Sequence, residues 1–141
     1  MIKRSWTYAT MAAFLMTGTM SIPSATATTE PIKIGVLADM SGTTMDMSGP
    51  GSVAAAKLAV EDFGGSILGR QIEVISGDHQ LKADIGSQIA RRWYDTENVD
   101  LIVSVPASAV GLAVQFVSRE RHKLMITTGT ITSDFTGKFC S

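Results

Sequence analysis

One stretch constrains the fold of this chain more than any other. It covers residues 99–135, VDLIVSVPASAVGLAVQFVSRERHKLMITTGTITSDF. Val99–Val103 is rich in β-branched and apolar residues, as in a parallel strand that is covered on both faces. Proline at the following turn ends this strand, and apolar residues then recur at helical spacing from Ala109 to Glu120. Leu124–Ile126 resumes a short strand. The stretch therefore predicts a strand, a helix and a second parallel strand.

The loops after these two strands carry small polar residues. Ser108 lies where the helix begins, and residues 127–133, TTGTITS, follow the second strand. Because the carboxyl ends of neighbouring parallel strands meet at one edge of a sheet, where open α/β folds bind ligands, we expect these two loops to face one site. Residue types and order here indicate a site for an anion or an amino acid.

The preceding residues repeat the strand–helix alternation. A glycine pair, Gly64-Gly65, ends the first helix, and Pro50 suits its first position. The remaining expected elements are a strand over Ile32–Ala38, a helix over Ser52–Phe63, a strand over Gln71–Ser76 and a helix over Ala83–Glu97, with Ile85, Ile89 and Trp93 buried. The sum is an α/β fold in the order β-α-β-α-β-α-β, with a parallel sheet and right-handed crossovers.

The first 27 residues have the three-part pattern of a signal peptide. Lys3 and Arg4 precede an apolar run over Ala9–Met20, and Ala25-Thr26-Ala27 is a cleavage motif. The run is shorter than the roughly 20 residues that a membrane span needs. We therefore expect export, cleavage after Ala27, and a mature domain over residues 28–141.

Several classes of function are disfavoured. The turn after the first strand lacks G-x-G-x-x-G, and neither a Walker motif nor a G-x-S-x-G elbow occurs. Two histidines and a single distant cysteine make no metal site, and no cofactor is implied. Cleavage would remove two of 12 basic side chains and none of the 13 acidic ones, so the mature charge of −3 does not suggest nucleic-acid binding.

The candidate site residues each have a structural alternative. Ser108 could cap its helix, or its hydroxyl could join the free helix amides in holding a carboxylate. Gly129 would allow close backbone approach, and Thr130 and Thr132 could donate to a carboxylate or accept from an ammonium group. His79 either contacts ligand or is merely an exposed turn residue. The methionines of the Asp39–Gly49 turn, at positions 40, 45 and 47, could line a pocket or pack beneath the loop.

Five segments in this order resemble a known family. They are IKIGVLADMSG, SGPGSVAAAKLAVEDFGG, LGRQIEVISGDHQ, VPASAVGLAVQ and TTGTITSDFTGKFCS. Together they resemble the exported substrate-binding proteins of ABC transporters, of the leucine/isoleucine/valine-binding type with the type I periplasmic-binding fold. The resemblance covers residues 32–141. It implies a periplasmic protein that closes two lobes on an amino acid or small acid, delivers it to membrane permease subunits, and is a monomer when full length.

The resemblance also assigns ligand contacts. The family's serine at the third helix start maps onto Ser108, and its threonine-bearing loop maps onto Thr130 and Thr132. The first loop often carries an aromatic contact where this sequence has about Met47, which argues against leucine or valine as the ligand. Relatives with the DHQ stretch form a subgroup whose ligands include other small carboxylates, such as aromatic acids.

The resemblance reaches only the beginning of the first lobe. It implies an N-terminal fragment that lacks the second lobe, that binds ligand weakly or not at all alone, and that is unstable or prone to aggregation. The single cysteine, Cys140, is next to the last residue and indicates either a free thiol or a partner cysteine that is missing. Three alternatives stay open: a ligand-sensing regulator of the same fold, a truncated product without function, and an enzyme of flavodoxin-like topology, for which no catalytic constellation is found.

Overall fold

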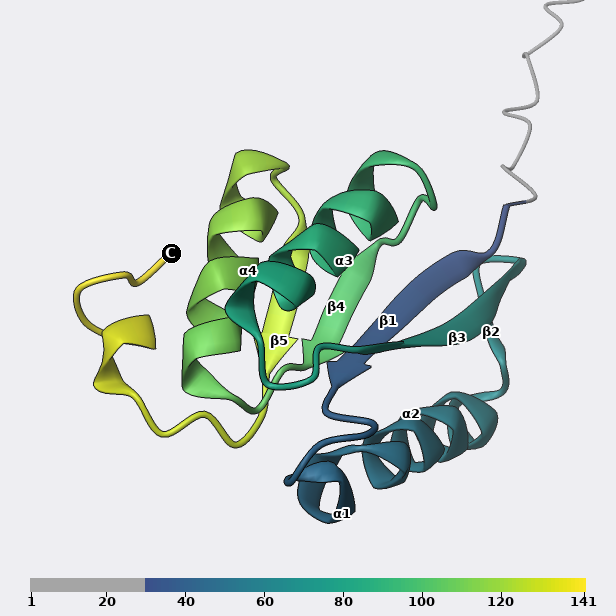
Figure 1. Cartoon of the computed structure of the whole chain (residues 1–141). Coiled ribbons are helices and arrows are strands. Elements are labelled where there is room, and N and C mark those ends of the chain that lie inside the picture. The colour runs from purple at the N-terminus through teal and green to yellow at the C-terminus, as the bar shows by residue number, and fades with distance from the viewer. Residues whose placement is uncertain (1–29) are drawn as a thin grey trace, which may run out of the picture.

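The computed structural model describes residues 30–141, which form a five-stranded sheet in the order β2-β3-β1-β4-β5 (Figure 1). The strands are β1 (Ile32–Ala38), β2 (Ser66–Ile67), β3 (Arg70–Asp78), β4 (Leu101–Ser104) and β5 (Leu124–Thr127). β1 pairs in parallel with β3 and β4, and β4 pairs in parallel with β5. Only the two-residue β2 is antiparallel.

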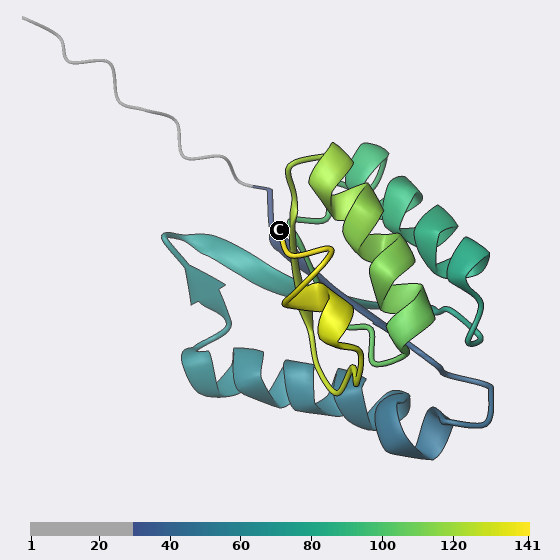
Figure 2. The same cartoon turned by 90° about the vertical axis from the view of Figure 1, so that its left-hand side faces the viewer.

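Helices cover the two faces of this sheet unequally. The helices α3 (Ala83–Asp95) and α4 (Ser108–Glu120) lie side by side on one face, and α2 (Pro50–Phe63) lies on the other beneath β1 and β3 (Figures 1 and 2). A one-turn helix, α1 (Met45–Ser48), precedes α2, and a short 3-10 helix, η1 (Ser133–Phe135), follows β5. Helix α2 does not extend over β5, and Leu124 and Ile126 on that side of β5 are exposed.

The core between the sheet and the helices α3 and α4 is centred on Trp93. This side chain is 2% exposed. A Cβ atom at Gly35 of β1 would lie 2.5 Å from its ring, and one at Gly77 of β3 would lie 2.9 Å from it. The indole can therefore pack against the two strands only because both positions are glycine.

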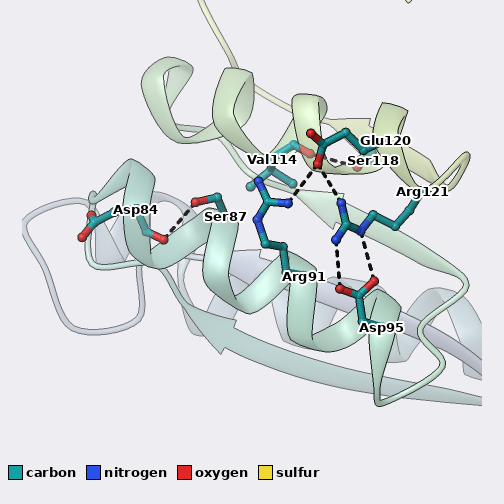
Figure 3. A network of polar contacts seen from close by, with 8 residues as sticks. All are labelled: Asp84, Ser87, Arg91, Asp95, Val114, Ser118, Glu120 and Arg121. Atoms are coloured by element: carbon teal, nitrogen blue, oxygen red, sulfur yellow. Dashed lines mark hydrogen bonds and ion pairs between the residues drawn. The ribbon is translucent and has the colours of Figure 1, made fainter.

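The helices α3 and α4 are joined at both ends. Near the start of α3, Gly86 lets α4 approach closely, since a Cβ there would fall 2.4 Å from Val110 Cγ1. At the other end, Arg121 makes two hydrogen bonds of 3.0 Å to the carboxylate of Asp95 and one of 2.7 Å to Glu120 (Figure 3). These ion pairs are partly exposed, so packing rather than charge holds the helices together.

The predicted α/β order is confirmed, with additions. The strand over Ile32–Ala38 and the glycine stop after α2 match the expectation, and Gly64 has the left-handed φ of 100° that suits such a stop. The elements α1, β2 and η1 were not predicted, because each is too short to show a periodicity. Helix α2 begins at Pro50, as its proline predicts, and ends at Phe63, whose side chain is exposed.

Two expectations concern export and the membrane. The predicted signal peptide, residues 1–27, lies outside the described residues. Within residues 30–141, none of the helices has the length and apolar character needed to cross a membrane.

Candidate functional site

A cavity of about 450 Å³ opens at the carboxyl edge of the sheet. Its walls come from the loop after β1, the turn after β3, and the loops after β4 and β5. The lining residues are Thr44, Met47, Ser48, Ser52, Leu81, Ser104, Pro106, Ala107, Ser108, Thr128, Gly129 and Ile131. None of these carries a charged side chain, so hydroxyl groups and backbone groups supply the polarity of the cavity.

Ser108 lies in this wall as the first residue of α4. The N-cap position belongs to Ala107, and no side chain caps the helix there. The Ser108 hydroxyl instead accepts a hydrogen bond of 3.4 Å from the backbone N–H of Ile131, in the loop after β5. Its proton is thus available to a further acceptor beside the first amides of α4, which have no partners inside the helix.

The backbone at the end of β4 is unusual. Ser104 and Val105 have φ values of 81° and 45°, a region that residues other than glycine rarely occupy. Each such residue costs on the order of 1–3 kcal/mol, and such residues cluster at functional sites. The Ser104 carbonyl accepts from Thr128 N–H at 2.8 Å, which couples this bend to the loop that carries Gly129.

Asp39, at the end of β1, organises the first loop. Its carboxylate is buried and accepts hydrogen bonds from Gly42 N–H, Thr44 N–H and the Thr44 hydroxyl, at 2.8, 2.9 and 2.8 Å. Burial raises the pKa of Asp39, but these hydrogen bonds outweigh it and hold the pKa below the ordinary value of 3.8. The charged carboxylate therefore orders the segment that leads to Thr44 and Met47 in the wall.

Asp78, at the end of β3, connects two loops. One oxygen accepts from Met40 N–H at 3.0 Å and from Gln80 N–H at 2.9 Å, and the other accepts from the Ser41 hydroxyl. Burial raises the pKa of Asp78 and the neighbouring Asp39 adds to this, yet the three hydrogen bonds lower the pKa overall. This carboxylate fixes the loop after β1 against the turn after β3.

His79 directly follows β3, in the turn before α3, and its side chain is fully buried. Nδ1 accepts a hydrogen bond of 3.0 Å from Leu81 N–H, so the proton of the neutral ring is on Nε2. Nε2 has no partner among the described residues. Burial lowers the pKa of His79, against the attraction of Asp39 and Asp78, which raises it. The imidazole is therefore kept neutral.

The structure gathers some of the predicted site residues. Ser108, Gly129 and Met47 line the cavity. Gly129 has the left-handed φ of 77° expected where a loop must turn closely. Thr130 and Thr132 are in the same loop but do not line the cavity, and the Thr132 hydroxyl accepts from Asp134 N–H at the start of η1. His79 lies beneath the surface rather than in the wall.

Sequence reasoning missed several lining residues. Thr44, Ser48 and Ser52 come from the loop after β1 and the start of α2, where the sequence pattern indicated a turn, a helix start and three methionines but no polar contact with a ligand. Leu81 and Ile131 have no local signal that marks them as part of a wall. The position of Thr128 directly after a predicted strand could have singled it out.

The described residues also form a second groove, but they form no metal site. A larger groove of about 700 Å³ runs between α4, β5 and the end of the chain, and Arg119, His122 and Lys123 are at its rim. Across residues 30–141, no cluster of histidine, cysteine or acidic side chains could hold a metal ion.

Comparisons with known proteins agree with this fold. A model of the periplasmic binding protein family matches residues 31–141. A solved periplasmic binding protein from Burkholderia mallei is 41% identical, with a TM-score of 0.77 over 79% of this chain and 30% of its own. The periplasmic ligand-binding protein of a branched-chain amino acid ABC transporter from Burkholderia xenovorans is 39% identical, with a TM-score of 0.75 over 78% of this chain and 29% of its own.

A third solved structure shows the same fold at lower identity. It is an ABC-transporter solute-binding protein from Rhodopseudomonas palustris in complex with 3,4-dihydroxybenzoic acid, with 24% identity and a TM-score of 0.70 over 75% of this chain and 29% of its own. No curated protein sequence was found to match. The chain spans about 30% of the length of the solved structures that it resembles. From the family match and these identities, the chain belongs to the periplasmic binding protein family of ABC transporters.

Proposed function

We propose that this chain forms one wall of the solute site of an ABC importer's binding protein, and that the solute is a small carboxylate or an amino acid. The observation that carries the proposal is the cavity at the carboxyl edge of the sheet, where the Ser108 hydroxyl lies beside the start of α4. In this role the protein binds reversibly, and no bond is made or broken.

The residues of the cavity suit such a ligand. A carboxylate placed at the start of α4 would accept from Ser108 and from free helix amides, and the helix dipole favours a negative charge there. Met47, Leu81 and Ile131 would contact the apolar part of the ligand. We propose Gly129 as a site of close backbone approach, and Thr130 and Thr132 as further hydroxyl groups of the same loop.

Two ligand classes follow from the relatives. The name of the Burkholderia xenovorans protein indicates branched-chain amino acids, and the Rhodopseudomonas palustris structure contains an aromatic acid. The uncharged wall would hold the carboxylate of either, and its hydroxyl oxygens could accept from the ammonium group of an amino acid. In the whole protein, we propose that a second lobe closes over the ligand in the periplasm and that permease subunits take it up.

The test is a titration of the ¹⁵N-labelled chain with leucine and with 3,4-dihydroxybenzoate, followed by amide chemical shifts. A single wall leaves much of a ligand exposed, so we expect a dissociation constant near 1 mM, about 4 kcal/mol of binding free energy. The shifts should concentrate at Ser108, Gly129 and Ile131. Ser108→Ala should weaken binding about tenfold or more, because a hydrogen bond to a charged group contributes roughly 1.5–3 kcal/mol.

The matched control is Ser87→Ala. Ser87 is on α3, outside the cavity wall, and its hydroxyl donates to the Asp84 carbonyl at 3.0 Å (Figure 3). This variant should bind as the unchanged chain does. Saturable shifts that map to the groove between α4 and β5, or equal losses for the two alanine variants, would contradict the proposed site.

A further inference from the structure

The turn between β3 and α3 has a backbone that its sequence does not favour. Gln80 and Leu81 have φ values of 51° and 58°, so two successive residues with side chains are left-handed. Neither is a glycine or an asparagine, the residues that tolerate this region. One backbone hydrogen bond closes the turn, from Lys82 N–H to the His79 carbonyl at 2.8 Å, so any further stabilisation must come from side chains.

Two side chains supply that stabilisation. Asp78 accepts from the N–H of Gln80, and His79 Nδ1 accepts from the N–H of Leu81, each two residues further along the chain. The Asp78 bond alone is a common turn device. The histidine bond is the additional one, and it acts directly on Leu81, a residue of the cavity wall.

We propose that His79 is a positioning residue: its Nδ1 holds Leu81 in the left-handed conformation that presents the leucine side chain to the solute cavity. His79 then affects the site through Leu81 and not by touching the ligand. The proposal deepens the proposed function, since it assigns the origin of one apolar part of the wall.

The burial of His79 supports this assignment. The ring is fully buried and does not line the cavity, so direct contact with a solute is not its role in this geometry. Nε2 has no partner among the described residues. Within residues 30–141, the one hydrogen bond of the ring is therefore the bond that fixes Leu81.

Two substitutions test whether the hydrogen-bond acceptor at Nδ1 matters, and not only the size of the ring. In His79→Asn, the amide oxygen falls near the position of Nδ1 and can accept from Leu81 N–H. In His79→Gln, the extra methylene moves the amide toward the position of Nε2. We expect the Leu81 amide to exchange with deuterium about tenfold faster in His79→Gln, and to be rescued in His79→Asn, since one hydrogen bond is lost only in the first. His122→Gln, at an exposed histidine, is the matched control.

The exchange is measured on the 141-residue chain without ligand, so its result does not depend on the proposed function. Equal exchange of Leu81 in the asparagine and glutamine variants would overturn the role of His79. A titration with 3,4-dihydroxybenzoate then tests the consequence for the site: weaker binding in His79→Gln, with recovery in His79→Asn, supports it. An unchanged affinity in a variant whose Leu81 amide is released would overturn it.

A spectroscopic measurement covers the case in which both variants unfold. The ¹⁵N shifts of the His79 ring in the unchanged chain report which nitrogen carries the proton. At neutral pH, we expect Nδ1 to be unprotonated and Nε2 to carry the proton. A proton on Nδ1 would overturn the proposal, because that nitrogen could not accept from Leu81 N–H.

Discussion

At the scale of single residues, two glycines decide how the main core packs. Gly35 and Gly77 are on neighbouring strands, and Trp93 lies across both. The indole is the largest fully buried side chain of the described core. A single methyl group at either glycine would occupy the space of the ring, so these positions constrain the sequence through packing and not through backbone conformation.

We predict that Gly35→Ala lowers the free energy of unfolding by about 1–3 kcal/mol, the typical effect of overpacking a core. The measurement is urea unfolding followed by Trp fluorescence and circular dichroism. Gly51→Ala is the control, because nothing lies within 4 Å of a Cβ at that position of α2. It should be neutral or slightly stabilising. Similar losses in the two variants would contradict the account of the core.

At the scale of elements, the loops after β1 and β3 behave as one unit. The carboxylate of Asp78 bonds to both loops, and Asp39 orders the first of them. The lowered pKa of each carboxyl stabilises the folded chain above the pKa of the unfolded state and is lost as pH falls. The lowered pKa of His79 acts in the same direction, because the unfolded chain binds a proton first.

We therefore predict that stability falls on acidification in two stages. The first begins as pH drops below about 6.5, where histidine in the unfolded chain takes up protons, and the second below about 4, where the carboxyl groups do. Urea unfolding at a series of pH values measures this. His79→Asn should remove most of the first stage and keep the second. Stability that rises between pH 6.5 and pH 5 would contradict the assignment of a neutral His79.

Sequence reasoning could predict the long elements but not the details that shape the site. The strand over residues 32–38 and the helices α3 and α4 have periodic apolar residues, so their existence followed from local pattern. Ser108, Gly129 and Met47 could be placed at the cavity because strand ends meet at one edge. The left-handed turn at Gln80–Leu81 depends on a buried histidine contact that no local pattern encodes.

At the scale of the whole molecule, the described residues build a sheet with α3 and α4 on one face and α2 on part of the other. Helix α2 contacts β1 and β3 (Figure 1). By contrast, Leu124 and Ile126 of the edge strand β5 are 60% and 48% exposed. The proposed solute cavity is lined by loops from the carboxyl edge of this one sheet. The solved Burkholderia mallei and Burkholderia xenovorans chains are each about three times as long as the region that this chain matches.

The central claim is that this wall receives a carboxylate at the start of α4. The most direct measurement is a crystal structure of the chain soaked with 3,4-dihydroxybenzoate or leucine. The account predicts a carboxylate about 3 Å from the Ser108 hydroxyl and the first amides of α4, with the rest of the ligand against Met47 and Leu81. A ligand bound instead in the groove between α4 and β5, with the Ser108 cavity empty, would contradict it.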